Sequence, residues 1–323
     1  MKDKQDIEKL RQKLTQDKAV LVICGPTGVG KSRTAIELAA VFSTHLISVD
    51  SMQTYKGMDI GTDKMPSGEI EQYMIDLFEP DTYVTAVMFR DLCRDVIRKE
   101  FFEKQRIPIL VGGSGLYIRA VMDKLDFAPG KNKESRKKLR NQIEKEGLEK
   151  FFKKLQEVDP EYSRKIGPND SRRIIRGLEV YNITGKPYSA YQKSWKERES
   201  VYNSFFIGLC KDRKILYNDI DRRVECMFEQ GLIEEVKELL DKGYGQSYPL
   251  RQATGYKEAA RYIKGEISLK ECIELVKRNS RRLAKKQLTW FKADPRINWI
   301  RADKYDNIFS LNCEIIRVIG EKR

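Results

Sequence analysis

The chain has 323 residues, which is enough for one large or two ordinary domains with a sizeable core. Its 62 basic and 48 acidic side chains give a formal charge of +14, which suggests a polyanionic partner, nucleic acid first, although plain solubility would also account for it. The single histidine, His45, effectively excludes histidine metal sites and Ser-His or Cys-His catalysis.

The cysteines and the N-terminal residues bear on the cellular compartment. The six cysteines form no C-x-x-C pair and most have apolar neighbours, which favours buried reduced thiols over zinc sites or disulfides. Residues 1–18 mix charges of both signs without an apolar core, and no stretch reaches membrane-spanning length. We therefore expect a soluble, cytoplasmic protein that does not contact a membrane.

The first predicted elements surround a glycine-rich motif. After a charged helix or loose tail over residues 2–18, the apolar run 19–24 predicts a buried parallel strand, and a helix should run to about residue 42. The segment between them matches the phosphate-binding pattern G-x-x-x-x-G-K-[ST] at every fixed position. It consists of Gly25, Pro26, Thr27, Gly28, Val29, Gly30, Lys31 and Ser32.

This order of elements predicts a site for a phosphorylated small molecule. In a strand, glycine loop and helix, successive backbone N–H groups and the helix N-terminus point at one anionic group. Lys31 adds a positive charge there, and the hydroxyl of Ser32 can ligate a magnesium ion. The competing explanation is a chance glycine-rich turn, and the flanking strand and helix argue against it.

A second strand over residues 45–50 carries Asp50 at its carboxyl end, followed by Ser51 and Gln53. Ligands in open α/β sheets bind beyond the carboxyl ends of the strands, so these side chains should face the glycine loop. Three roles are open for Asp50: a magnesium-holding acid, a general base, or a helix cap at the end of the strand. Ser51 and Gln53 offer donors and acceptors suited to a base edge or a sugar.

Strands and helices alternate up to about residue 120. The patterns predict, in order, a loop over 54–69, a short strand over 73–76, a helix over 85–104, a buried strand over 107–111 and a glycine-rich segment over 112–117. The glycines of that segment and Ser114 fit either the close approach of a ligand or a tight turn. The alternation predicts an α/β fold, a phosphate-loop NTPase-like doubly wound parallel sheet.

Residues 121–194 differ in character and predict an all-helical insertion domain within a core domain formed by 1–120 and 195–323. Between residues 131 and 145 there are seven basic and two acidic side chains, and helical patterns continue to about residue 191. No convincing strand interrupts them.

Three arginines follow a capping acid, Asp170, within this insertion. Helical spacing places Arg172 and Arg176 on one face, with Arg173 beside them. This arrangement suits contacts to phosphates or splayed bases. It also fits a solvated face paired with Glu179, and both readings stay open.

Residues 204–209 return the chain to the sheet, and three helices near 213–242, 255–262 and 268–292 precede a last strand over 297–300. The segment 277–293 contains no acid and seven basic residues: Lys277, Arg278, Arg281, Arg282, Lys285, Lys286 and Lys292. Because the segment ends in Trp290 and Phe291, it fits RNA backbone contact combined with base stacking. The alternative is an ordinary basic helix whose Leu283, Leu288 and Trp290 face the core.

Taken together, these residues resemble the tRNA dimethylallyltransferase family, also called tRNA isopentenyltransferases, over nearly the whole chain. The shared motifs are residues 25–32, 50–55, 58–62, 112–117, 170–181, 255–258 and 283–290. The chain departs from the family pattern in two places. Residues 72–74 are Gln-Tyr-Met where a histidine pair is usual before Ile75-Asp76, and Ser114 stands where threonine is common.

The resemblance implies transfer of a dimethylallyl group from dimethylallyl diphosphate to the exocyclic amine of the adenosine immediately 3′ of the anticodon in tRNA. The products would be N6-isopentenyladenosine and diphosphate. The implied partners are the tRNA anticodon stem-loop and dimethylallyl diphosphate, the implied cofactor is magnesium, and the protein is expected to be a monomer. The target adenosine must leave the anticodon stack to reach a buried site.

The resemblance also assigns roles to individual residues. Asp50 corresponds to the family's catalytic base, Thr27 would hydrogen-bond at the reacting end, and Arg223 corresponds to the diphosphate arginine. The diphosphate would lie on residues 25–32, with magnesium at Ser32. The residues expected to contact tRNA are Asp50, Ser51, Met52, Gln53, Ser114, Arg136, Arg172, Arg173, Ile174, Ile175, Arg176, Arg282, Lys285, Lys286 and Trp290.

Two other functions fit parts of the sequence. A small-molecule phosphate-loop kinase would use Asp50 to hold magnesium, but the strand over 107–111 ends in glycines rather than a second acid, and a kinase leaves the basic segment 277–293 unexplained. A non-catalytic, nucleotide-gated RNA-binding protein would make little use of a base at Asp50.

Overall fold

The computed structural model describes residues 4–66, 68, 70–130 and 132–321. The chain divides into two compact units, one comprising Met1–Val121 and Tyr202–Arg323, the other Met122–Val201. We call them the core unit and the insertion unit. The divisions lie after residues 121 and 201, whereas the expected insertion domain was 121–194. Residues 2, 3, 67, 69 and 131, which belong to the expected N-terminal helix or tail, the loop 54–69 and the basic run 131–145, lie outside the described residues.

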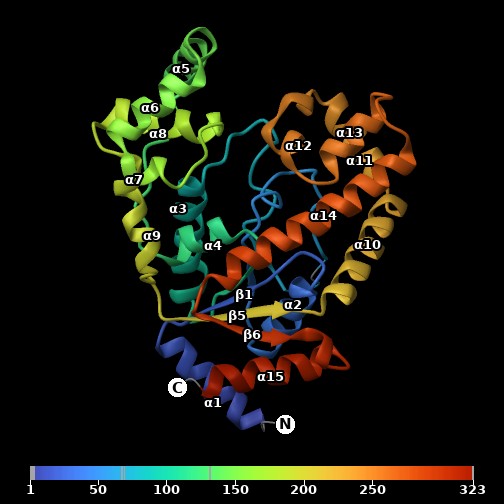
Figure 1. Ribbon diagram of the computed structural model, residues 1–323. Helices are drawn as coiled ribbons and strands as arrows, with labels where there is room; N and C mark the ends of the chain where they lie inside the picture. Colours follow the sequence, from blue (N-terminus) through green and yellow to red (C-terminus); the bar gives the residue numbers. More distant parts are fainter. Residues whose placement is uncertain (1–3, 67, 69, 131, 322–323) are drawn as a thin grey trace. The chain divides into compact units, whose positions relative to one another are not determined.

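The described part of the core unit forms a six-stranded sheet in which every pairing is parallel, in the order β3-β2-β4-β1-β5-β6 (Figure 1). Its strands are β1 (Val20–Cys24), β2 (Leu46–Ser48), β3 (Gln72–Tyr73), β4 (Ile109–Gly112), β5 (Ser204–Cys210) and β6 (Ile297–Arg301). The predicted parallel α/β fold is confirmed. Since all strands run the same way, β1, β2 and β4 deliver the segments that follow them to one edge of the sheet.

The central strands are buried because helices cover both faces of the sheet, which is why β1 and β4 are continuous apolar runs. Leu21 and Ile23 of β1 belong to a core cluster with Leu14 of α1 and Ile315 of α15. Figure 1 shows α1 and α15 on one side of the sheet and α4 and α14 on the other.

The helical elements of the core unit are α1 (Lys4–Gln16), α2 (Lys31–Val41), α3 (Ala86–Val96), the π-helical turn η1 (Ile97–Phe102), α4 (Gly115–Met122), α10 (Arg213–Glu229), α11 (Leu232–Asp241), η3 (Tyr244–Gln246), α12 (Tyr248–Gln252), α13 (Tyr256–Ile263), α14 (Leu269–Lys292), η4 (Ala302–Lys304) and α15 (Ile308–Glu321).

Several predicted elements need correction. The single helix expected over 213–242 is two helices, because Gly231 adopts the left-handed conformation with φ of 98° and breaks the chain between α10 and α11. The segment 112–117 is not all loop, since α4 begins at Gly115. Helix α15 was not predicted, and α3 continues into a π-helical turn.

The insertion unit is helical, as its sequence indicates. Its elements are α5 (Lys133–Glu146), α6 (Leu148–Val158), α7 (Pro160–Ser163), α8 (Ser171–Thr184), η2 (Tyr188–Gln192) and α9 (Lys193–Glu197). Among its described residues the only extended pairing is the isolated bridge between Asp123 and Ser200. A separate core cluster that includes Leu139, Leu155 and Ile174 joins α5, α6 and α8.

The described part of the chain contains no helix that is both long and apolar enough to cross a bilayer. All six cysteines are unpaired. Cys24, Cys93 and Cys272 are buried, as expected, whereas Cys226 is exposed. Burial raises the pKa of the Cys24 thiol to about 12, so this side chain behaves as a small apolar group next to the glycine loop.

Candidate functional site

The glycine motif lies in the tight connection between β1 and α2. Gly25 and Gly28 both have positive φ, and each leaves no room for a side chain. A Cβ at Gly25 would lie 2.5 Å from the Leu209 carbonyl oxygen of β5, and one at Gly28 would lie 2.7 Å from Ile220 of α10. These two glycines therefore let the loop lie directly against β5 and α10.

Lys31 lies at the start of α2 and points back over the loop. Its Nζ donates a 2.7 Å hydrogen bond to the Pro26 carbonyl. Burial, together with the nearby positive charge of Arg223 and against the opposing charge of Asp50, lowers the pKa of Lys31 to about 8. An anion bound on the loop would restore the charged form, because it adds an opposite charge close to the ammonium.

Asp50 follows β2 by two residues and faces the same cavity as Lys31. Its Oδ1 accepts a 2.9 Å hydrogen bond from the Met52 backbone N–H, which fixes the carboxylate within a local turn. The predicted alternative of a helix cap is wrong, since the residues after Asp50 form turns rather than a helix. Ser114, at the end of the neighbouring strand β4, accepts a 3.4 Å hydrogen bond from the Ser51 N–H.

Gln53 joins two parts of the site. Its Oε1 accepts a 2.6 Å hydrogen bond from Ser48 of β2, and its Nε2 donates a 3.0 Å hydrogen bond to the Thr62 carbonyl. The side-chain amide of Gln53 is therefore engaged at both ends. It ties the end of β2 to the loop 58–63.

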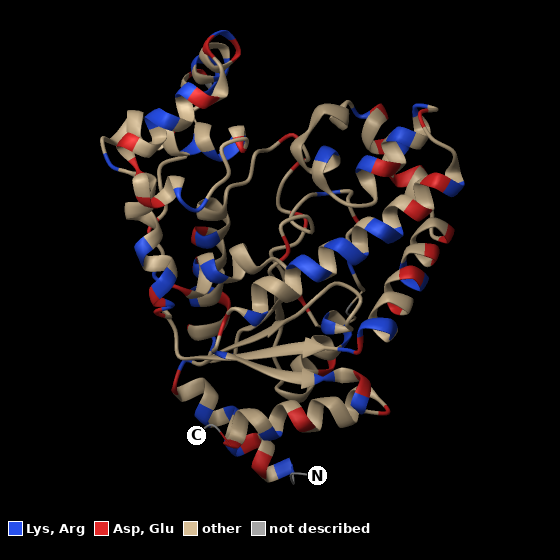
Figure 2. Ribbon diagram, viewed as in Figure 1, with Lys and Arg blue, Asp and Glu red and all other residues tan. Residues whose placement is uncertain are grey.

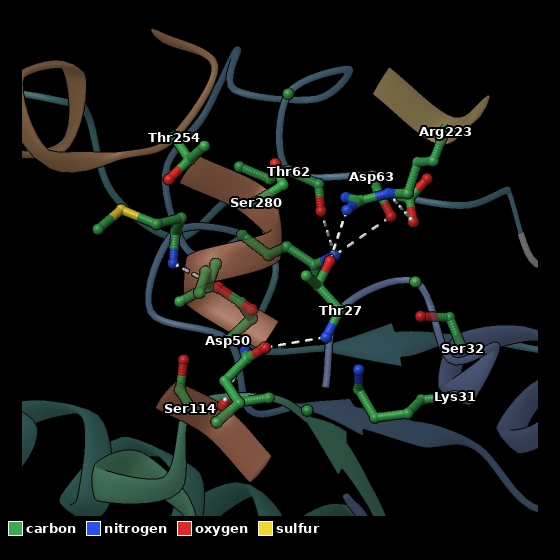
Figure 3. Close-up of a pocket in the computed structure, with 18 of the residues that line it drawn as sticks. Thr27, Lys31, Ser32, Asp50, Thr62, Asp63, Ser114, Arg223, Thr254 and Ser280 are labelled. Atoms are coloured by element: carbon green, nitrogen blue, oxygen red, sulfur yellow. Dashed lines mark hydrogen bonds and ion pairs between the residues drawn. The ribbon is translucent and has the colours of Figure 1, made fainter. Parts of the chain in front are cut away.

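Arg223, on α10, reaches across to the glycine loop. Its guanidinium donates a 2.5 Å hydrogen bond to Thr27 Oγ1 and forms an ion pair with Asp63, with Nε 3.1 Å from Oδ2. Figure 3 shows Arg223 directed toward Thr27 and Asp63, with Lys31 and Ser32 on the adjoining part of the loop. Thr27 and Arg223 were each expected to act on the donor, whereas the hydrogen bond between them and the ion pair with Asp63 were not predicted.

The loop that carries Asp63 is held by Glu235 of α11. The Glu235 carboxylate accepts hydrogen bonds from the backbone N–H groups of Asp59, Ile60 and Gly61, at 3.0, 2.8 and 3.4 Å, and from the Tyr256 hydroxyl at 2.5 Å. Burial, followed by the charge of Glu235, strongly raises the pKa of Tyr256. Tyr256 therefore stays a neutral donor.

The glycine loop, Asp50, Gln53, Asp63 and Arg223 line one cavity of about 530 Å³, within the usual size of small-molecule sites. Of the predicted site residues it contains Thr27, Gly28, Gly30, Lys31, Ser32, Asp50, Ser51, Met52, Gln53, Ser114 and Arg223. Apolar side chains also line it, namely Met65, Val111, Met227, Val276 and Leu283. The cavity thus combines a cationic, amide-rich region with an apolar region and the carboxylates of Asp50, Asp63 and Asp219, of which Asp50 follows β2.

Oxygen donors suited to magnesium lie in this cavity. The hydroxyl of Ser32 and the carboxylates of Asp50 and Asp219 all line it. Magnesium typically uses one or two protein oxygens together with substrate phosphates and water rather than a cage made only of protein. The donor set at this position fits that pattern.

Helix α14 carries the basic segment, and its seven cations divide into groups (Figure 2). Lys277 and Arg281 are paired with Glu225 and Asp221 of α10, each at 2.6 Å. The exposed basic side chains Arg278, Arg282, Lys285, Lys286 and Lys292 show no ion pair of this kind. We call Arg278, Arg282, Lys285 and Lys286 the exposed basic face of α14.

The aromatic end of α14 does not all face the core. Phe291 is buried, but Trp290 keeps 44% of its surface exposed and Leu283 keeps 40%. Trp290 lies against Gly115, where an added Cβ would meet its ring at 2.1 Å. Of the three side chains in the core-facing alternative, only Leu288 packs against the core cluster.

The predicted arginines of the insertion unit serve different contacts. Arg136 and Arg176 each form a 2.9 Å ion pair with Glu179, whose side chain is fully buried. Burial alone would raise the pKa of Glu179, but the hydrogen bonds from both arginines lower it. Arg176 also donates a 2.7 Å hydrogen bond to the Pro129 carbonyl. The predicted pairing with Glu179 is therefore present, through Arg176 and Arg136.

The other members of the 170–176 segment have separate positions. Asp170 caps α8, as predicted, by accepting a hydrogen bond from the Arg173 N–H at 3.1 Å. Arg172 and Arg173 are exposed, and Arg173 also lies 3.4 Å from the Asp170 carboxylate. Ile174 and Ile175 are buried in the core of the insertion unit, so their side chains face that core.

The chain is similar to known proteins over most of its length. The protein-family model described as IPP transferase matches residues 53–294, and the one described as isopentenyl transferase matches residues 18–78. A tRNA dimethylallyltransferase from Thermoanaerobacter sp. (strain X514) is 43% identical over 309 residues, which is 94% of this chain and 98% of the relative. The enzyme of that name from Carboxydothermus hydrogenoformans is 45% identical over 289 residues, covering 88% and 92%.

Solved structures agree with the sequence relatives. A tRNA isopentenylpyrophosphate transferase from Bacillus halodurans superimposes with a TM-score of 0.67 at 37% identity, covering 94% of this chain and 98% of that one. A eukaryotic dimethylallyltransferase, solved in snapshots of its action on tRNA, gives a TM-score of 0.74 at 28% identity and covers 88% and 74%.

Proposed function

This chain belongs to the IPP transferase family of tRNA dimethylallyltransferases, and we propose that it joins its two substrates in the cavity between the glycine loop and Asp50. The reaction is transfer of a dimethylallyl group from dimethylallyl diphosphate to the exocyclic amine of the adenosine 3′ of the anticodon. One observation carries the assignment: the glycine loop, the guanidinium of Arg223 and the carboxylate of Asp50 share a single cavity.

The diphosphate is assigned to the loop 25–32. Loop N–H groups and the N-terminus of α2 supply oriented dipoles, and Lys31 and Arg223 supply charge. When the bond between the first dimethylallyl carbon and its oxygen breaks, negative charge gathers on the leaving diphosphate. Donors fixed in advance at that position stabilise the transition state more than the ground state.

The acceptor nitrogen forms the new bond to the first carbon of the dimethylallyl group as the old bond breaks. The adenine amine then carries one proton too many, and we assign its removal to the Asp50 carboxylate. Thr27, held between Arg223 and the loop, is assigned to the reacting end of the donor. The apolar cavity wall formed by Met227, Val276 and Leu283 suits the hydrocarbon group and keeps water from it.

Magnesium is proposed to bind through the hydroxyl of Ser32 together with the diphosphate, and the carboxylate of Asp219 lines the same cavity. When bound, it supplies additional positive charge to the leaving group. The loop N–H groups, Lys31 and Arg223 would also stabilise the charge of the diphosphate.

Contacts to tRNA are proposed on three groups of residues. Ser51, Met52, Gln53 and Ser114 line the cavity where the target nucleotide would enter. Arg282, Lys285, Lys286 and Trp290 are exposed on α14 and suit the backbone and bases of the anticodon arm. In the insertion unit, Arg172 and Arg173 are exposed, and Arg136 and Arg176 support that surface through Glu179. A cytoplasmic location and a monomeric state remain predictions.

The test is to incubate the protein with unmodified tRNA, magnesium and labelled dimethylallyl diphosphate. We expect label to enter tRNA without ATP, and nucleoside analysis to locate it at the adenosine 3′ of the anticodon. Consumption of ATP with a small acceptor would instead indicate a kinase. Tight tRNA binding without transfer would indicate a non-catalytic RNA-binding protein.

A further inference from the structure

Gln287 of α14 inserts its side chain between the glycine loop and the end of β4. Its Oε1 accepts a 2.8 Å hydrogen bond from the Thr27 backbone N–H, and its Nε2 donates a 3.0 Å hydrogen bond to the Gly113 carbonyl. Both ends of the amide are therefore engaged, and each holds a backbone group more than 170 residues away in the sequence.

The turn after β4 is shaped to admit this side chain. A Cβ at Gly113 would lie 2.4 Å from Gln287 Nε2, and a Cβ at Gly115 would lie 2.1 Å from the Trp290 ring. Gln287 and Trp290 are three residues apart and so project from one face of α14. Two glycines thus make room for two α14 side chains, which fixes the position of the helix along the turn.

Thr27 is consequently held from two directions. Gln287 occupies its backbone N–H, so this amide is turned away from any anion on the loop, while Arg223 donates to its hydroxyl. The backbone contact sets where the hydroxyl lies relative to the guanidinium. A side chain that only filled space would not need both an acceptor and a donor at these positions.

We propose that Gln287 is a positioning residue for prenyl transfer: it holds Thr27 in the orientation in which the hydroxyl meets Arg223 at the reacting end of the donor. This inference rests on the proposed function of the cavity. It also gives α14 two tasks, because Arg282, Lys285 and Lys286 on its other faces are exposed to solvent. The helix that is proposed to bind RNA therefore also holds the glycine loop in place.

The test uses Gln287→Met, which keeps the length of the side chain but removes its donor and acceptor. We expect kcat for prenylation of tRNA to fall by about tenfold or more, because small misplacements of catalytic groups have effects of this size. The KM for tRNA should stay within about threefold, since the exposed basic face is unchanged. Thr289→Ala, on the exposed side of the same helical turn, is the matched control and should keep wild-type kinetics.

A double-mutant cycle separates positioning from general packing. If Gln287 acts through Thr27, the Thr27→Val/Gln287→Met variant should turn over no more slowly than Thr27→Val alone. Independent, multiplying losses would overturn the proposal, as would an unchanged kcat in Gln287→Met. Either result would leave the prenylation activity of the wild-type protein, and hence the proposed function, intact.

Gly113→Ala provides a second route if Gln287→Met folds poorly, as judged by its melting temperature. The added methyl group would displace the Gln287 amide without removing it. We expect the same pattern, a lower kcat with an unchanged KM for tRNA. A Gly113→Ala protein that melts like wild type and retains full kcat would contradict the proposal.

Discussion

At the scale of single residues, Asp50 carries the sharpest expectation. Its carboxylate is fixed by the Met52 N–H and lines the cavity opposite the glycine loop. Asp50→Asn keeps the size and can still accept that hydrogen bond, but an amide cannot take a proton from the adenine amine. Turnover should therefore be almost abolished while tRNA affinity, measured by filter binding, stays nearly wild-type. An equal loss of both would show that Asp50 supports the structure instead.

Arg223 should matter mainly in the transition state. Its guanidinium lies on Thr27 and faces the position assigned to the leaving diphosphate. Arg223→Ala is expected to cost roughly 2–4 kcal/mol in kcat/KM, as for other lost charge-stabilising donors. Arg222→Ala, at the neighbouring position on α10, is the control. A loss confined to tRNA binding would place Arg223 outside the reaction.

The depressed pKa of Lys31 predicts a pH effect on donor binding. Burial lowers this pKa to about 8, so the ammonium is charged below that pH and is progressively lost above it. The affinity of the tRNA-free protein for inorganic diphosphate should therefore fall as pH rises through about 8. Lys31→Arg should show less of this fall, because a guanidinium keeps its charge. Ionisation of the ligand is common to both proteins, so identical pH profiles would exclude Lys31 as the cause.

At the scale of elements, α14 is expected to contribute charge to RNA binding through one face only. Lys286→Glu should weaken tRNA binding and flatten its dependence on salt, because phosphate contacts release counterions. Lys270→Glu introduces the same charge change in the first turn of the same helix, outside the exposed basic face, and is the matched control. Equal effects of the two substitutions on the salt slope would point to net charge rather than to this face.

The helices and strands could largely be predicted where the periodicity of apolar residues agrees with the positions of glycine and other turn-forming residues. The apolar runs of β1, β4 and β5 and the glycine motif before α2 identify the parallel sheet and its loop. A single glycine within a helical pattern is tolerated, so the sequence alone does not show that a helix ends at Gly231; its left-handed φ in the structure does. Helix α15 begins after Asn307, whose side chain accepts a 2.9 Å hydrogen bond from the Ser310 N–H. Its stability also depends on packing against α2 and the sheet, which local sequence does not reveal.

At the scale of the whole molecule, the insertion unit should depend on its buried carboxylate. Glu179 joins α8 to Arg136 of α5 and to the backbone N–H of Asn132. Glu179→Gln leaves two arginines without their counter-charge and should cost roughly 3 kcal/mol of unfolding free energy, near the low end for buried pairs because both arginines keep some exposure. Thermal unfolding measures this, with the exposed Glu144→Gln as control. An unchanged melting temperature would show that the pair contributes nothing to stability.

The contacts that build the site are the part that sequence reasoning could not supply. Thr27, Lys31 and Asp50 were predicted because each lies within a local motif at a strand end. Asp63 and Gln287 were not assigned roles, since their partners Arg223 and Thr27 lie 160 and 260 positions away and only the folded chain brings them together. Likewise, the sequence shows only that Arg136 and Arg172 are both cations. The structure shows that Arg136 is paired with the buried carboxylate of Glu179.

The ion pairs between α10 and α14 have a kinetic consequence. The carboxylates of Glu225 and Asp221 neutralise the charges of Lys277 and Arg281. Most of the remaining positive charge of α14 therefore lies on its exposed basic face. An approaching polyanion is drawn most strongly to the exposed side of that helix, which limits the orientations in which the two molecules first meet. Neutralising the side of α14 that faces α10 can therefore increase the rate of correctly oriented association, even though it removes two cations from the field that attracts the polyanion.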